Sequence, residues 1–197
     1  MTTLIILYLL CFTVLYNETR LCMRTPILET ERLILRPLCL EDAQEAFDCW
    51  GCDPDIARYM FWTSHKDIDE TKEWLNFEIS KINSEDWYRW VFVLKESRAL
   101  IGTGLIYFEE EYNMFEIGYN LGKKAWGCGY TTEAMKELIY FAKHVLNIKE
   151  IVGRYAKENK GSGSVLKKLG FKYVKDCPYE CNNGKTLYEG EEYLLKL

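Results

Sequence analysis

The feature that most constrains this chain's fold is a pair of glycines, Gly127 and Gly129, standing between two different apolar patterns. Residues 114–121 before them have the pattern of a strand, and residues 131–145 after them repeat apolar side chains at helical spacing. Glycine gives up side-chain contacts and loses extra backbone entropy on folding, so this pair indicates that something must approach the backbone closely. Free N–H groups and the dipole at a helix start bind phosphate well. The sequence therefore predicts a pyrophosphate cradle over residues 126–131.

The apolar pattern of the rest of the chain predicts an α/β fold. Strands are expected at residues 33–37, 90–94, 100–108, 114–121, 148–155, 171–175 and 187–195. Helices are expected at residues 41–50, 67–82, 131–145 and 162–169. An antiparallel meander followed by alternating strands and helices predicts a mixed sheet with helices on both faces.

A single domain is expected over residues 23–197. The chain has 197 residues, of which 48% are apolar and 28% charged, and no linker or repeat follows Arg24. The net charge of -5 argues against nucleic acid as the main partner.

The first 22 residues form an apolar extension that we expect to lie outside this domain. Its apolar run, residues 4–16, is shorter than the roughly 20 residues of a membrane-spanning helix. It also lacks the leading basic residues and the small-residue cleavage site of a signal peptide, since the first basic residue is Arg20. We expect a cytoplasmic protein whose working form begins near Met23, with a membrane-surface anchor as the alternative.

The eight cysteines allow two interpretations. Cys49 and Cys52, with Cys177 and Cys181, have spacings that a four-thiolate zinc site could use. Irregular spacing in a chain of this length favours reduced thiols instead. The two histidines have no metal-like spacing, and we expect no metal.

Other uses of the glycine pair fit less well. A Walker loop needs lysine where Cys128 stands, although Gly122 and Gly127 have its spacing. A Rossmann fingerprint needs a third glycine where Thr132 stands. A plain strand-to-helix turn without a ligand remains open on this segment alone.

The glycine segment resembles the acetyl coenzyme A loop of the GNAT N-acetyltransferase superfamily, whose pattern is Gln/Arg-x-x-Gly-x-Gly/Ala. Residues 126–134, Trp-Gly-Cys-Gly-Tyr-Thr-Thr-Glu-Ala, are similar to the form in its ribosomal-protein-alanine acetyltransferase subgroup. Residues 30–37 resemble that subgroup's opening strand, residues 116–119 its fourth strand, and residues 159–171 the family's second cofactor motif. The resemblance covers about residues 28–195. It implies a mostly antiparallel, twisted sheet of about six to seven strands with helices on both faces.

The resemblance also implies transfer of an acetyl group from acetyl-CoA, the co-substrate, to a primary amine. A protein N-terminal amine is the expected acceptor. The alternatives are a small-molecule amine, such as an antibiotic or a polyamine, and a non-catalytic coenzyme A binding module. Main-chain groups of the strand at 116–121 are expected to bind the pantetheine arm. The implied cofactor-binding residues are Ile117, Gly118, Tyr119, Lys124, Trp126, Gly127, Cys128, Gly129, Tyr130, Thr131 and Asn159.

Glu116 is the candidate general base. An alkyl amine is mostly protonated at neutral pH and must lose a proton before it attacks a thioester. Glu116 is a carboxylate within an apolar strand beside the predicted loop, and partial burial would raise its pKa toward neutrality. The alternative is a solvent-facing charge in a region rich in acids.

The proton donor to the leaving thiolate is the open part of the chemistry. Many members of the superfamily have a tyrosine in the last helix where this chain has Leu166. Ser162 and Tyr155 remain as candidates, and the resemblance favours Ser162 because its motif lies along the pantetheine arm. An ordinary serine at a helix start is the equal alternative.

Two departures from the family pattern concern the cofactor segments. Lys124 stands where the family usually has glutamine or arginine, so it keeps a charge but lacks the forked guanidinium. Glycine at both Gly161 and Gly163 is expected to loosen the start of the last helix and to weaken cofactor binding.

The acceptor is expected on the side built by the early helices. The aromatic residues available there are Trp50, Tyr59, Phe61, Trp62 and Trp87, most of which we expect to serve core packing. The sequence does not distinguish a monomer from a homodimer.

Overall fold

The computed structural model describes residues 25–197, so the apolar extension of residues 1–22 and the alternative start at Met23 lie outside the described residues. Within the described residues, none of the helices combines the length and the apolar character that crossing a membrane requires.

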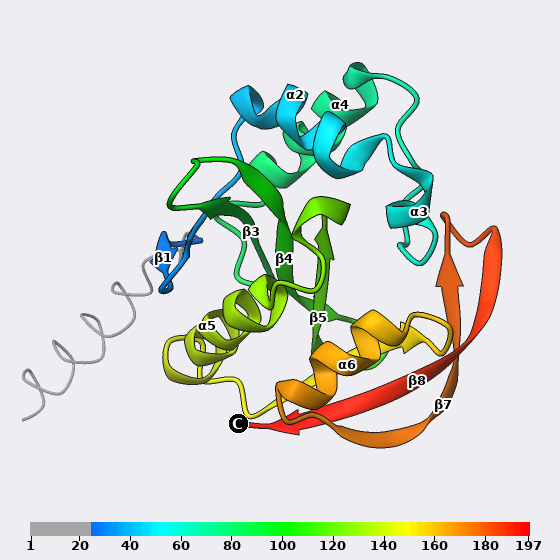
Figure 1. The fold of residues 1–197 in the computed structure, drawn as a ribbon. Helices are drawn as coiled ribbons and strands as arrows, with labels where there is room; N and C mark the ends of the chain where they lie inside the picture. The colour runs from blue at the N-terminus through cyan, green and yellow to red at the C-terminus, as the bar shows by residue number, and fades with distance from the viewer. Residues whose placement is uncertain (1–24) are drawn as a thin grey trace, which may run out of the picture.

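One eight-stranded sheet runs through the described part of the chain (Figure 1). Its strands are β1 (Leu28–Glu29), β2 (Leu33–Arg36), β3 (Trp87–Leu94), β4 (Leu100–Glu109), β5 (Met114–Leu121), β6 (Glu150–Ala156), β7 (Lys172–Cys181) and β8 (Thr186–Lys196). Their order is β1-β2-β3-β4-β5-β6-β8-β7, and only the pair of β5 and β6 is parallel. The predicted mixed, mostly antiparallel sheet is confirmed. The two-residue β1 adds the strand beyond the expected six to seven.

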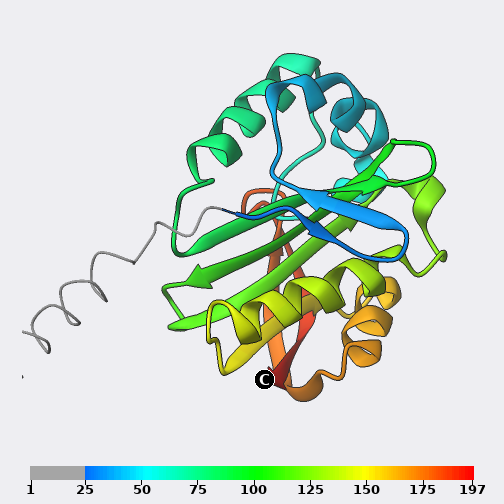
Figure 2. The same cartoon turned by 90° about the vertical axis from the view of Figure 1, so that its left-hand side faces the viewer.

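Helices cover both faces of the sheet, as predicted. The helices are α2 (Ala43–Ala46), α3 (Pro54–Ala57), α4 (Ile68–Ser80), α5 (Tyr130–His144) and α6 (Lys160–Lys168), with short 3-10 turns η1 (Leu40–Asp42) and η3 (Lys123–Ala125) and a π-helical turn η2 (Phe47–Gly51). Figure 2 shows α2 and α4 on one face, and α5 and α6 on the other.

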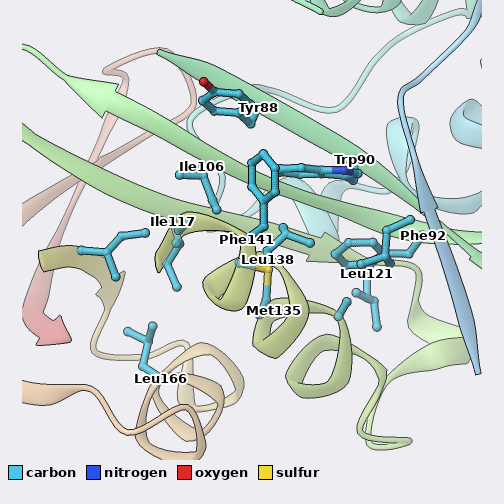
Figure 3. Close-up of a cluster of buried hydrophobic side chains, with 14 of the residues drawn as sticks. Tyr88, Trp90, Phe92, Ile106, Ile117, Leu121, Met135, Leu138, Phe141 and Leu166 are labelled. Atoms are coloured by element: carbon cyan, nitrogen blue, oxygen red, sulfur yellow. The ribbon is translucent and has the colours of Figure 1, made fainter. Parts of the chain in front are cut away.

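The larger of two apolar cores fills the space between the sheet and α5 (Figure 3). Trp90 and Ile106 from the sheet are fully buried there against Met135, Leu138 and Phe141 of α5. Alternate residues of a strand share a face, so the opposite face carries a second core formed with α2 and α4. Packing on both faces holds the sheet in place, including the ends of its central strands.

The helix expected at residues 41–50 is present as one helical run over residues 40–51, whose hydrogen-bond pattern changes from 3-10 to α to π. η1 leads into α2, and the following π turn η2 ends at Gly51. There is little room beside Gly51, since a Cβ atom on it would lie 3.2 Å from His65 Nδ1 and 3.3 Å from Thr71 Oγ1. Asp53 then caps α3, a helix that apolar spacing did not indicate, by accepting the N–H of Asp55 at 2.9 Å.

Candidate active site

The two parallel strands of the sheet separate from one another and open a cleft. Registered pairing of β5 with β6 comprises Phe115 with Ile151 and Glu116 with Val152, although β5 continues to Leu121. Beyond that point lies a cleft of about 510 Å³, a size that suits a small ligand. Its walls come from the end of β5, the glycine loop, the start of α6 and the α3 segment. Segments far apart in sequence therefore meet at one opening.

The glycine loop forms one end of this cleft. Gly127 has φ +73° and Gly129 has φ +82°, a left-handed backbone that favours glycine whatever lies nearby. No atom lies within 4 Å of a Cβ built on Gly127, so the space in front of the loop is open. Gly129 is the N-cap of α5 and supplies no side-chain cap. Within residues 25–197, the N–H groups of Tyr130, Thr131 and Thr132 have no hydrogen-bond acceptor. The open loop and these free donors fit an anionic ligand.

Arg32 and Glu133 hold this loop in place, and the sequence analysis did not identify them. The Glu133 carboxylate accepts the Thr30 hydroxyl at 2.6 Å, the Arg32 backbone N–H at 2.8 Å and the Arg32 Nε at 2.7 Å. Arg32 also donates to the Cys128 carbonyl at 3.1 Å and lies 4.2 Å above the Tyr130 ring. The opening strand segment and the loop form one unit. The signal was present in the sequence, because Thr30 and Arg32 belong to the segment that resembled the family.

The start of α6 forms the opposite wall. Asn159 caps the helix by accepting the Ser162 N–H at 3.2 Å, and both residues line the cleft. The Tyr119 hydroxyl of β5 donates to the Ser162 carbonyl at 3.1 Å, which ties the two walls together. Lys160 and Lys168 also line the cleft, and eight residues place them on one face of α6. Their helical spacing could have identified them as cations beside the predicted pyrophosphate cradle.

The two glycines at the start of α6 have different structural roles. A Cβ on Gly163 would lie 2.6 Å from the Tyr155 ring and hydroxyl, so this glycine is required for the helix to pack on β6. A Cβ on Gly161 would meet only Asn159 Oδ1, at 3.5 Å. The expectation that both loosen the helix therefore needs correction at Gly163, which permits tight packing.

Glu116 lies where β5 and β6 separate and is 7% exposed. Burial raises the pKa of Glu116 to about 7, although Arg154 opposes this shift. Arg154 Nη1 donates to the Glu116 carboxylate at 2.9 Å, and its Nε donates to Glu192 at 2.9 Å. The Tyr112 ring covers the Arg154 guanidinium at 3.7 Å. Glu116 is thus a buried, charge-paired carboxylate rather than a solvent-facing one.

The two candidate proton donors lie in different places. Ser162 lines the cleft. Tyr155 instead lies under Gly163 and donates its hydroxyl to the Glu191 carboxylate. Leu166, at the position of the family's tyrosine, is fully buried in the core. Of these three, only Ser162 contacts the cleft.

The predicted cofactor residues divide into those that line the cleft and those that support it. Lining residues are Tyr119, Trp126, Gly127, Gly129, Thr131 and Asn159. The others, namely Ile117, Gly118, Lys124, Cys128 and Tyr130, lie in the same two segments but do not line it. Ile117 is buried in the core, whereas Lys124 and Cys128 are exposed, and the Cys128 thiol donates to the Trp126 carbonyl at 3.5 Å. Trp126 is fixed by an indole hydrogen bond to the Leu121 carbonyl at 2.8 Å.

A strap of backbone hydrogen bonds joins residues 60–61 to the β7–β8 turn on the side where the acceptor is expected. Met60 lines the cleft, and its carbonyl accepts the Asn182 N–H from the β7–β8 turn at 2.9 Å. The Phe61 carbonyl accepts the neighbouring Asn183 N–H. Tyr59 also lines the cleft and stacks edge-on with Tyr188 at 5.3 Å. Among the aromatic residues named above, Trp50 is buried in the core and Phe61 is 65% exposed.

The alternative four-thiolate zinc site has no support within residues 25–197. Cys49, Cys52, Cys177 and Cys181 are free thiols there. That part of the chain also holds no cluster of three or more His, Cys, Asp or Glu side chains able to bind a metal.

Comparison with known proteins agrees with this geometry. Residues 32–172 match the model of the acetyltransferase (GNAT) domain. An uncharacterized N-acetyltransferase, p20 of Bacillus licheniformis, is 34% identical over 146 residues, covering 73% of this chain and 81% of p20. The ribosomal protein uS5-alanine N-acetyltransferase of Escherichia coli is 36% identical over 63 residues, covering 30% of this chain and 32% of the enzyme.

A solved structure extends the comparison to the fold. The ribosomal L7/L12 alpha-N-protein acetyltransferase RimL, in complex with coenzyme A, superposes with a TM-score of 0.76 at 16% identity, covering 87% of this chain and 98% of RimL. The family model spans well over half of the chain, and its match includes the glycine loop and the start of α6. The chain therefore belongs to the GNAT family of acetyltransferases.

Proposed function

We propose that this N-acetyltransferase uses acetyl-CoA as its co-substrate and acetylates the N-terminal amine of a protein. The observation that carries the proposal is the cleft at the end of β5, which joins free α5 N–H groups to the start of α6. RimL, which has the same fold, is known in complex with coenzyme A. Acetyl-CoA, when bound, supplies the activated acetyl group.

Residues at the two ends of the cleft would bind different parts of acetyl-CoA. The backbone N–H groups of residues 130–132 would hold the diphosphate, and Lys160 and Lys168 would add positive charge beside it. Main-chain groups of β5 beyond Glu116 would pair with the pantetheine arm, because β6 no longer pairs with them. The Asn159 amide nitrogen, opposite the oxygen used for capping, would donate to an amide carbonyl of the arm.

Glu116 would accept the proton of the incoming amine, through a water molecule. A carboxylate with a pKa of about 7 is half ionised at neutral pH and can both accept and release a proton there. Glu116 lies on β5 at the last pair with β6 and does not itself line the cleft, which is why a water molecule is needed between it and the amine. Ser162, which lines the cleft, would donate a hydrogen bond to the departing sulfur.

The choice of acceptor draws support from the relatives. The Escherichia coli enzyme acetylates an alanine of ribosomal protein uS5, and RimL acetylates ribosomal L7/L12. A small-molecule amine is the second candidate, because the strap of Met60 and Phe61 with the β7–β8 turn borders the side where the acceptor is expected. Both acceptor classes are compatible with a cytoplasmic enzyme.

Thiol release measured across an amine panel tests the proposal. Peptides with free N-termini, polyamines and aminoglycosides are offered with acetyl-CoA, and release of coenzyme A is followed. Turnover of a peptide, with an N-terminal acetyl group found by mass spectrometry, is expected. Coenzyme A binding without turnover on any amine would indicate a binding module instead.

A further inference from the structure

One buried side-chain amide beside the cleft has a hydrogen-bond donor that no acceptor in the described residues pairs with. Asn120, the penultimate residue of β5, lines the cleft and is 8% exposed. Its Nδ2 is fully buried and has no hydrogen-bond partner within residues 25–197. Buried polar groups are nearly always paired, so an unpaired donor at a cleft calls for an acceptor from outside the chain.

A chain of hydrogen bonds fixes the orientation of this amide. Arg89 Nη1 donates to the Thr103 hydroxyl at 3.1 Å, and that hydroxyl donates to Asn120 Oδ1 at 2.6 Å. A guanidinium can only donate, so the hydroxyl accepts from Arg89 and gives its own proton to the amide oxygen. The Asn120 nitrogen is therefore the end that faces away from the chain of bonds.

The far end of this hydrogen-bond chain is anchored rigidly. Arg89 Nε lies 2.7 Å from the Glu78 carboxylate, which is buried on α4. That carboxylate also accepts the indole N–H groups of Trp74 at 3.1 Å and Trp87 at 2.8 Å. An orientation held by so many partners is retained when a ligand enters, which makes the donor selective.

The Asn120 amide lies on the face of the sheet that α2 and α4 cover, which is the side where we expect the amine substrate. Asn120 shares a face of β5 with Glu116, since alternate residues of a strand point the same way. Val91 on this face packs with α2 and α4, opposite the α5 core. The proposed phosphate site lies at the start of α5, so the amide faces the amine acceptor rather than the phosphates.

We propose that Asn120 Nδ2 donates a hydrogen bond to a carbonyl oxygen next to the acceptor amine. This inference rests on the proposed function and names the acceptor class within it. An α-amino acyl group, as at a peptide N-terminus, carries such a carbonyl, whereas an alkyl amine or polyamine leaves the donor unpaired. Asn120 is then a specificity-determining residue for α-aminoacyl acceptors.

The test compares two small amines that differ in the carbonyl. Alaninamide has a carbonyl next to the amine-bearing carbon, and isopropylamine has a methyl group there. The ratio of their kcat/KM values is measured in wild type and in Asn120→Asp, which has the same shape but presents an oxygen instead of the donor. We expect the ratio to fall roughly tenfold or more, the usual effect of removing one buried donor. Comparing ratios cancels the different pKa values of the amines.

Two further variants complete the design. Thr103→Val releases the amide from its hydrogen-bond chain and is expected to lower the same ratio, by less than Asn120→Asp. Asn76→Asp, an exposed change on α4, is the matched control and should leave the ratio unchanged. Circular dichroism confirms that each variant folds, and the Kd for coenzyme A shows separately whether the cofactor still binds.

The outcomes separate the two proposals. An unchanged ratio in a folded Asn120→Asp protein overturns the role of Asn120 and leaves the acetyltransferase proposal intact. A weaker Kd for coenzyme A with an unchanged ratio shows that the amide contacts the cofactor, and also overturns it. Absence of thiol release with every amine overturns the proposed function and this inference together.

Discussion

Arg32 and Glu133 lie 101 residues apart in sequence, yet the Arg32 guanidinium lies 2.7 Å from the Glu133 carboxylate through both Nε and Nη2. The same guanidinium holds the carbonyl of Cys128 within the glycine loop. The pair therefore fixes the shape of the loop more than it stabilises the whole fold, since Arg32 remains 42% exposed.

Replacing Arg32 by alanine should weaken cofactor binding with little loss of stability. The loop would lose its tie to Cys128 and the ring contact with Tyr130, so we expect the Kd for coenzyme A to rise about 10-fold. The Tm should fall by no more than a few degrees, as for a partly exposed ion pair. Isothermal titration and thermal melts measure both. Lys72→Ala, which removes an exposed pair on α4, is the control and should change neither. A Kd equal to that of wild type would contradict this role for Arg32.

Replacing Glu116 by glutamine should change the pH dependence of the rate. Ionised Glu116 is the proposed base and its pKa is about 7, so wild-type kcat/KM should rise with pH and level off above that value. The variant should lose about 100-fold in rate and also lose the inflection near pH 7. Glu110→Gln, in the exposed turn before β5, serves as control. Acceptors with different amine pKa values separate the enzyme's inflection from theirs. A variant with the wild-type profile would exclude Glu116 as the base.

The same substitution should change stability in a pH-dependent way. The pKa of Glu116 rises from 4.5 to about 7 on folding, so its favourable contribution is complete below pH 4.5 and is lost as pH rises through 7. Wild type should thus lose about 3 kcal/mol relative to Glu116→Gln between pH 4 and pH 8. Urea unfolding of both proteins across this range gives the difference directly. A difference that stays constant with pH would mean that Glu116 is not desolvated in solution.

The two glycines of α6 should respond oppositely to alanine. Gly163→Ala forces a Cβ to within 2.6 Å of the Tyr155 ring and should cost about 1–3 kcal/mol of unfolding free energy. Gly161→Ala meets no close atom and should stabilise the protein by up to about 1 kcal/mol through helix propensity. Chemical denaturation compares them, each serving as the other's control. Equal effects would show that packing on Tyr155 does not decide the cost at Gly163.

The sequence predicted the elements whose pattern is long and regular. The meander β3–β5, the long α5 and the glycine loop all lie close to their predicted ranges, because apolar periodicity and glycine placement are local signals. The helix expected at residues 41–50 is also present, but its change from 3-10 to α to π hydrogen bonding was not predicted. Apolar spacing indicates a helix but carries no information about which hydrogen-bond pattern closes each turn.

The site was predictable to a similar degree. Residues that line the cleft and belong to a family motif, such as Gly127 and Asn159, could be identified from their neighbours in sequence. The sequence marked the segments that hold Arg32 and Glu133 but not their pairing, and it gave no sign of the hydrogen bonds from Arg89 to Asn120, because both sets of contacts join elements that only the tertiary fold brings together. The roles of all these residues in turnover stay predictions until the variants above are measured.

Because β5 and β6 pair at only two residue pairs, the sheet has two halves, β1–β5 and β6–β8, that are joined by this short pairing. The strap from Met60 and Phe61 to the β7–β8 turn is a second connection between these two halves. A ligand bound in the cleft would contact both halves of the sheet. Exchange of the backbone amide hydrogens should then slow in both halves together. The rigidity of this enzyme would then depend in part on the fraction of molecules that have a ligand bound in the cleft.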